Sequence, residues 1–177
     1  MSMITKAKAF ALEAHKDQTY GDLPYDYHLK EVVKNVLGSA SYKNVPFGEQ
    51  DSVVAAAWLH DVVEDTDVTL NDIRDQFGGR VARIVDFCTD EPGENRKERK
   101  AKTLKKIAKA PSYAKLVKLG DRLANMRASI ENPGMSKMYR KEFPQFIKIV
   151  GDDSENQAIV NELFWVYIDS ELSEKSS

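Results

Sequence analysis

The chain has 177 residues, of which 42% are hydrophobic, and a formal net charge of −2 at pH 7. This length is enough to bury one hydrophobic core, and the weak net charge excludes a strong electrostatic attraction to DNA, RNA or an anionic membrane. The single cysteine, Cys88, excludes an internal disulfide and fits a reducing cytoplasm, and no run of about 18 apolar residues exists that would span a membrane. We therefore expect a cytoplasmic globular protein without a nucleic-acid or membrane partner, while the sequence leaves the oligomeric state open.

Apolar residues recur at helical spacing along the chain, whereas the alternating β-branched runs typical of strands are missing. The first segment is amphipathic and lacks the unbroken apolar run of a signal peptide. Thr69 is a predicted N-cap, and Pro111 precedes a second predicted helix start. The predicted helices span residues 2–18, 29–43, 49–65, 70–77, 79–88, 96–109, 112–130, 136–150 and 155–172. We expect an all-α single domain over residues 1–177, with a frayed polar tail at 170–177.

The stretch WLHDVVEDTD, which begins at residue 58, places several ionisable side chains at the end of an apolar helix. At about 100° per residue, four of them share one helix face; they are His60, Asp61, Glu64 and Asp65. Any one of these acids alone is most simply a solvated helix end. Together, however, three carboxylates repel one another and oppose the helix dipole, which indicates a cation beside them. Adjacent histidine and aspartate residues offer the nitrogen and oxygen ligands that divalent transition metals accept.

Further metal ligands must come from elsewhere in the chain. His15 and His28 are the remaining histidines, and alone either is more often a surface or packing residue than a ligand. In the segment KLVKLGDRLANMR, apolar residues occupy two sides of a predicted helix, so Asp121 is expected to be largely buried. A buried carboxylate requires a cationic partner. That partner is either an arginine, such as Arg122 or Arg127, or a metal ion.

The order of these motifs resembles that of the HD-domain phosphohydrolases. HDVVEDT followed about 60 residues later by KLGDRLANMR is similar to the hydrolase domain of the RelA/SpoT family. The resemblance runs from about residue 7 to residue 150. It implies a stand-alone, Mesh1-like small alarmone hydrolase, because the chain has no room for the synthetase domain of the larger family members. A bare His-Asp dipeptide would carry no such information.

The resemblance implies an HD-type helical bundle and a role for each matching residue. A single Mn²⁺, or another divalent transition metal, would be held by His28, His60, Asp61 and Asp121. The attacking water would be oriented and activated by Glu64 and Asp65. Asn125 would contact the ribose, and the basic run NRKERKAK would lie over the pocket, although most of its lysines are expected on a solvated helix face. The remaining substrate contacts would come from Arg96, Lys97, Arg99, Tyr20, Lys118, Tyr139 and Phe143.

The reaction implied by the resemblance removes the 3′-pyrophosphate of guanosine tetra- or pentaphosphate, the alarmones of the stringent response. Water would attack directly and release GDP or GTP with pyrophosphate. A divalent metal suits this chemistry because it lowers the pKa of bound water and offsets charge on phosphate oxygens. A covalent nucleophile is not expected, since Cys88 lies on an apolar face and no serine adjoins a histidine.

One segment departs from the family pattern. In DQTYGDLPYDYH, Tyr20 stands where the family has an arginine that grips the nucleotide, and nothing between Lys16 and Lys30 is basic. A tyrosine can stack on a base, but it cannot neutralise a phosphate. Two alternatives therefore stay open. One is the same chemistry on another nucleotide, such as the 2′-phosphate of NADPH or an adenosine analogue, and the other is a nucleotide-binding module without turnover.

Overall fold

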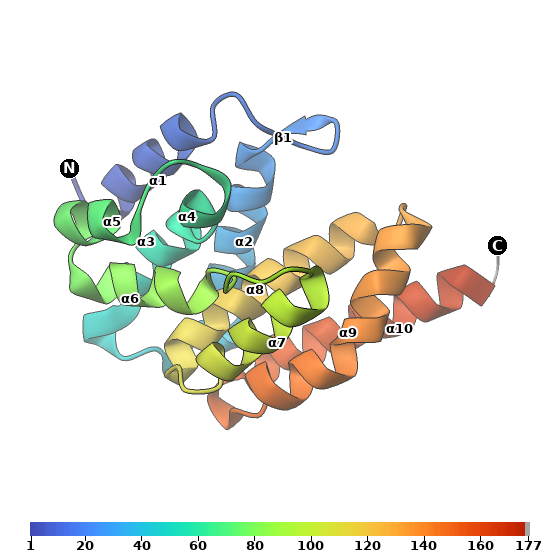
Figure 1. Ribbon diagram of the computed structural model, residues 1–177. Coiled ribbons are helices and arrows are strands. Elements are labelled where there is room, and N and C mark those ends of the chain that lie inside the picture. The colour runs from blue at the N-terminus through green and yellow to red at the C-terminus, as the bar shows by residue number, and fades with distance from the viewer. Residues whose placement is uncertain (176–177) are drawn as a thin grey trace.

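Helix α8 (Ser112–Ser129) runs through the middle of the protein, and other helices pack around it (Figure 1). Its predicted apolar stripe, which includes Leu116, Leu119 and Leu123, is fully buried. Residues on its other sides are buried as well, because α8 contacts helices from both halves of the chain. The side chain of Asp121 is therefore held in the interior, as the sequence predicts.

The computed structural model describes residues 1–175. Its other α-helices are α1 (Met3–Ala14), α2 (Asp26–Gly38), α3 (Gln50–Leu59), α4 (Val62–Asp65), α5 (Leu70–Phe77), α6 (Gly79–Cys88), α7 (Arg96–Ile107), α9 (Pro133–Val150) and α10 (Gln157–Lys175). Short 3₁₀ turns are η1 (Ala40–Asn44), η2 (Phe47–Glu49) and η3 (Ser154–Asn156). Helices α2, α3, α6, α9 and α10 each contact α8. The predicted all-α fold class is confirmed.

A small hairpin replaces the end of the first predicted helix. Helix α1 stops at Ala14 rather than at residue 18, and β1 (Thr19–Tyr20) pairs antiparallel with β2 (Leu23–Pro24). Gly21, with a φ of 61°, allows the tight turn between them. The sequence did not predict these strands, because each has only two residues and so shows no alternating pattern.

The predicted helix 49–65 is interrupted at His60 and Asp61, where α3 ends and α4 begins. Nδ1 of His60 lies 2.9 Å from the carbonyl oxygen of Ala57. In an uninterrupted helix, that oxygen would accept the backbone N–H of Asp61. The imidazole of His60 therefore occupies the carbonyl oxygen that the helix would need for its next backbone hydrogen bond. This competition explains why the helix breaks at His60 and Asp61.

Several predicted boundaries agree with the structure. Helix α5 begins with a capping box between Thr69 and Asp72, and Gly78, with a φ of 87°, follows its end.

Helix α10 continues to Lys175, past the predicted end at residue 172. Residues 176–177 of the predicted frayed tail lie outside the described residues, and its fraying stays a prediction. Among residues 1–175, none of the helices combines the length and apolar composition that crossing a membrane requires.

Helices α2 and α8 approach each other closely at Gly120. A Cβ atom at this position would lie 2.9 Å from Cγ2 of Val36 and 3.4 Å from the carbonyl oxygen of Val32. Both neighbours belong to the fully buried core. The absence of a side chain at Gly120 therefore sets the distance between α2, which carries His28, and α8, which carries Asp121.

Replacing Gly120 with alanine is expected to lower the free energy of unfolding by about 1–3 kcal/mol, because the added methyl group forces α2 and α8 apart. Gly38→Ala is the matched control, since a Cβ there meets nothing within 4 Å; it should change stability by less than about 1 kcal/mol, in the stabilising direction. Urea unfolding of both variants measures the difference. Equal stabilities would contradict the close approach.

Candidate metal centre and active site

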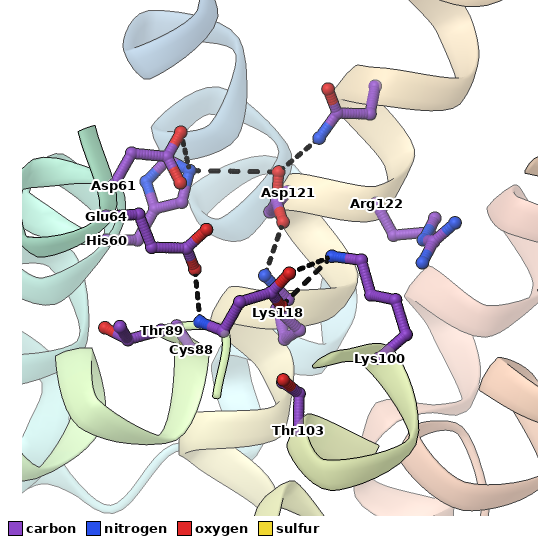
Figure 2. Close-up of polar contacts among 12 residues, drawn as sticks. His60, Asp61, Glu64, Cys88, Thr89, Lys100, Thr103, Lys118, Asp121 and Arg122 are labelled. Carbon is purple, nitrogen blue, oxygen red and sulfur yellow. Dashed lines mark hydrogen bonds and ion pairs between the residues drawn. The ribbon is translucent and has the colours of Figure 1, made fainter. Parts of the chain in front are cut away.

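Two histidines and two aspartates from separate segments meet between α2, α8 and the α3–α4 turn. They are His28 of α2, His60 and Asp61 of the turn, and Asp121 of α8. Nε2 of His28 lies 3.2 Å from Nε2 of His60 and 3.2 Å from Oδ2 of Asp61. Oδ1 of Asp121 lies 3.5 Å from the same His28 nitrogen and 3.8 Å from Nε2 of His60. Figure 2 shows His60, Asp61 and Asp121 converging on one point.

The donor set of this cluster fits a divalent metal ion. Because a carbonyl oxygen can only accept, Nδ1 of His60 carries the proton shared with Ala57, so Nε2 is the nitrogen that would face a metal ion. The ligand atoms of His28, His60 and Asp121 all lie within 4.8 Å of one another. Burial opposes a charged imidazole at His60, but Asp61 and Asp121 raise its pKa to about 9. The pocket therefore favours positive charge.

The protein cation beside Asp121 is a lysine and not one of the two arginines considered from the sequence. Nζ of Lys118 lies 3.0 Å from Oδ2 of Asp121 in the interior. Burial opposes the charged carboxylate, but Lys118 and both histidines of the cluster hold the pKa of Asp121 below its usual value. Arg122 and Arg127 pair with acids on α9 and α10 instead. One oxygen of Asp121 thus faces the lysine, and the other faces the histidines.

The two predicted water-activating carboxylates lie one turn beyond the ligands, on α4. Oε1 of Glu64 accepts a hydrogen bond of 2.5 Å from the backbone N–H of Asp90, and burial raises the pKa of Glu64. Oδ2 of Asp65 accepts a hydrogen bond of 2.7 Å from the hydroxyl of Tyr25, which lies equally close to Oδ2 of Asp61. A carboxylate with a raised pKa beside a metal site is suited to take a proton from water.

Tyr20 and Asn125 contact each other at the mouth of the cluster. The hydroxyl of Tyr20 donates to Oδ1 of Asn125 at 2.8 Å, and its ring stacks on His28 with the centroids 4.7 Å apart. The amide of Asn125 donates to Oδ1 of Asp121. Tyr20, which stands where an arginine was expected from the family pattern, therefore covers Asn125, the residue predicted to contact the ribose.

The side chains of the basic run at the start of α7 differ in their surroundings. Arg96 forms an ion pair of 2.8 Å with Glu142, and Lys97 is exposed. Arg99 is half-buried, and its side chain lies against Gly93. Lys100, which the sequence analysis did not select, lies 2.8 Å from Asp90. Roles for Arg96, Lys97 and Arg99 in substrate binding stay predictions.

Lys100, Lys118 and Arg122 line a small cavity, together with the acids Asp90 and Glu142. Figure 2 shows how Lys100 and Lys118 extend into the space below Asp121. A second hollow lies on the other side of α8 and is lined by Tyr20, Tyr27, His28, Glu31 and Arg127. The metal cluster is thus flanked by one cationic cavity and one hollow with aromatic walls.

The two aromatic residues predicted on α9 are both buried. Tyr139 lies under the guanidinium of Arg122, 4.9 Å from ring to charge. Phe143 stacks on Tyr167 of α10 at 4.5 Å and is 2% exposed. Both rings are part of the packing between α9 and its neighbours, and a direct contact of either with a nucleotide stays a prediction.

Sequence reasoning missed two residues that touch the site. Tyr25 is the N-cap of α2, three residues before His28, and its hydroxyl reaches both Asp61 and Asp65. Lys100 lies one turn after Arg96 on α7. In each case the signal was the helical spacing from a residue already selected.

Comparison with known proteins agrees with this geometry. The model of the HD domain family matches residues 7–145. The chain belongs to the HD domain family. Among curated HD relatives, the guanosine-3′,5′-bis(diphosphate) 3′-pyrophosphohydrolase MESH1 of Danio rerio is 36% identical over 121 residues, which cover 67% of this chain and 64% of that protein. The human protein of the same name is 34% identical over 129 residues, which cover 71% of this chain and 69% of the relative. The chain therefore spans about two thirds of the length of these relatives.

Solved structures share the fold of this chain. A metazoan orthologue of SpoT, described as hydrolysing ppGpp, superposes with a TM-score of 0.78 at 24% identity, covering 94% of both chains. A Listeria monocytogenes protein superposes with a TM-score of 0.58 at 23% identity, covering 79% of this chain and 98% of that one. Membership of this family, together with the histidine and aspartate cluster, supports a divalent metal in the site.

A divalent metal ion is expected to stabilise the folded protein, by about 2.7 kcal/mol when its concentration is 100 times its Kd. The measurement is thermal unfolding with and without added Mn²⁺ after treatment with a chelator. Asp61→Ala should abolish the stabilisation, whereas Asp75→Ala, which removes an exposed acid on α5, should keep it. Equal stabilisation of both variants would show that the metal binds elsewhere.

Cys88 is expected to be inert in the folded protein. It is fully buried, and burial raises the pKa of its thiol to about 12. At pH 8, a thiol reagent should therefore modify it at least about 100-fold more slowly than free cysteine. The urea-unfolded chain serves as the control and should react completely, while rapid reaction of the native protein would contradict the burial.

Proposed function

We propose that this protein is a metal-dependent hydrolase that removes the 3′-pyrophosphate of guanosine tetra- or pentaphosphate, releasing GDP or GTP and pyrophosphate. The observation that carries the proposal is the convergence of His28, His60, Asp61 and Asp121, with Glu64 and Asp65 one turn away. The pyrophosphohydrolase names of the curated relatives support the choice of substrate. A small nucleotide in the cytoplasm is the partner that fits this site.

The four converging residues would hold one divalent ion, and we propose Mn²⁺. Two imidazoles and two carboxylates leave positions open for water and substrate, as a catalytic metal requires. When bound, such an ion lowers the pKa of water and offsets the negative charge of the phosphate. Asp121 would be fixed for this task by Lys118 on one side and by the amide of Asn125 on the other.

The carboxylates of α4 would handle the proton of the attacking water. Water attacks the phosphorus attached to the ribose 3′-oxygen, the bond between that phosphorus and the 3′-oxygen breaks, and the nucleotide leaves with a proton on that oxygen. Glu64 is the stronger candidate for accepting the proton of the water, because its pKa is raised. Asp65, held by Tyr25, would orient the water.

The two hollows beside the metal cluster support separate roles in binding. Lys100 and Lys118 would bring positive charge to the phosphates, since both line the cationic cavity. The aromatic rings of Tyr20 and Tyr27 would offer stacking surfaces to the base in the other hollow. Asn125 lies between the two, where a ribose would sit.

A second candidate substrate follows from the hairpin. Tyr20 covers Asn125 and carries no positive charge, so the hairpin side of the site has less attraction for phosphate than the family pattern provides. The same chemistry on another nucleotide, such as removal of the 2′-phosphate of NADPH, needs fewer phosphate contacts. Equal rates on guanosine and adenosine substrates would favour this second candidate.

Purified protein with Mn²⁺ is expected to release pyrophosphate from guanosine tetraphosphate. Glu64→Gln should lower kcat by about 100-fold or more, because an amide still accepts the N–H of Asp90 but cannot take a proton. Mn²⁺ stabilisation should persist in this variant and be lost in Asp61→Ala. Glu13→Gln, which changes an exposed acid on α1, is the matched control and should keep full activity.

Two outcomes would contradict the proposal. Absence of pyrophosphate release at micromolar enzyme would remove guanosine alarmones as substrates. Full activity of Glu64→Gln would remove that residue as the base. Metal stabilisation in the absence of any nucleotide hydrolysis would leave a binding module.

A further inference from the structure

We infer that Tyr25 is a positioning residue that ties the proton-handling side of the site to the metal side, an inference that rests on the proposed function. Its hydroxyl lies 2.7 Å from Oδ2 of Asp61 and 2.7 Å from Oδ2 of Asp65. Asp61 belongs to the metal cluster, and Asp65 belongs to the water-activating pair. A single hydroxyl therefore holds the two carboxylates no farther apart than two hydrogen-bond lengths.

The ring of Tyr25 is fixed from the opposite side by His15. The two rings stack with centroids 4.4 Å apart and planes 9° from parallel, and the His15 side chain is buried. Nδ1 of His15 in turn lies 2.7 Å from Oε1 of Gln18. The histidine that the sequence left without a role is thus the surface against which Tyr25 is packed.

Gln18 contacts His15, Tyr25 and Asp65, and so connects all three residues. The side-chain amide of Gln18 donates to the backbone oxygen of Asp65 at 2.6 Å, and the backbone oxygen of Gln18 accepts the backbone N–H of Tyr25 at 3.1 Å. Asp65 is therefore held at its backbone by Gln18 and at its carboxylate by Tyr25. Groups that must be placed within fractions of an ångström for catalysis are commonly supported in this way.

The hydroxyl of Tyr25 suits this task because it remains a hydrogen-bond donor. Its oxygen lies equally close to one carboxylate oxygen of Asp61 and to one of Asp65. The one hydroxyl proton can be donated to either carboxylate, because both acceptor oxygens lie at the same distance. Without this donor, Asp61 and Asp65 would repel each other, and Asp65 would be free to turn away from the metal side.

A purely structural role would depend on the ring, whereas a positioning role depends on the hydroxyl. Tyr25→Phe separates the two, because phenylalanine keeps the stacking on His15 and loses both hydrogen bonds. The matched control is Tyr167→Phe, which removes a tyrosine hydroxyl that donates to Glu171 at 2.8 Å on α10, away from the metal cluster. Both variants should retain the helical circular dichroism spectrum of the wild type.

For Tyr25→Phe we expect the affinity for Mn²⁺, measured by electron paramagnetic resonance without nucleotide, to weaken by about 10-fold. We expect kcat on guanosine tetraphosphate to fall by about 10–100-fold, while KM stays within about threefold. Tyr167→Phe should match the wild type in all three quantities. In an Asp65→Asn background at saturating Mn²⁺, adding Tyr25→Phe should cost less than about threefold in kcat, because the hydroxyl then affects turnover only through Asp65.

Wild-type kcat and Mn²⁺ affinity in Tyr25→Phe would overturn the inference while leaving the proposed function in place. A loss in KM alone, or losses that multiply fully in the double variant, would also overturn it. If the wild type hydrolyses no alarmone, the proposed function fails by itself. The Mn²⁺ measurement then decides the inference: weaker binding in Tyr25→Phe supports a link from Tyr25 to Asp61, and unchanged binding overturns it.

Discussion

A buried group of carboxylates has to be balanced by positive charge, and this requirement organises the centre of the protein. Asp61 and Asp121 face two imidazoles, and Asp121 also faces a buried lysine. Ion pairs of this kind are costly to bury, since the loss of hydration can exceed the attraction between the partners. Such a cluster is better explained by the chemistry that it supports than by any contribution to stability. The surrounding core therefore has to stabilise the site.

The geometry of the cluster depends on how closely α2 approaches α8. Gly120 is adjacent to Asp121, and its missing side chain allows α2 to pack directly against this turn. On α8, the residues Lys118, Asp121 and Asn125 follow one another at helical spacing, so one rigid helix presents a cation, a carboxylate and an amide together. The α3–α4 break then turns His60 and Asp61 toward them. Packing and chemistry thus use the same helices.

Much of this arrangement could be predicted from the sequence, and the parts that could not have definite physical reasons. Helical periodicity and capping located α5, α6 and α8, because these signals are local. The grouping of His60 with Asp121 came from a family resemblance, since no local signal joins residues so far apart. Lys118 as the partner of Asp121 depended on which α8 side chains face inward. The hairpin depends on tertiary contacts, to which periodicity is blind. Helical spacing marks Tyr25 and Lys100 as neighbours of selected residues, but it does not show which side chains they contact.

The chemistry and the choice of substrate occupy different parts of the fold. The metal cluster and the α4 carboxylates are built on helices that form the core, whereas the proposed nucleotide contacts lie on the hairpin and on α7. A tyrosine at position 20 therefore changes the recognition side without displacing any metal-site residue. The two parts meet at Tyr25, which follows the hairpin directly and reaches Asp61 and Asp65 with one hydroxyl. Because the backbone N–H of Tyr25 also donates to the backbone oxygen of Gln18, just before the hairpin, the placement of both carboxylates is linked to the position of this segment.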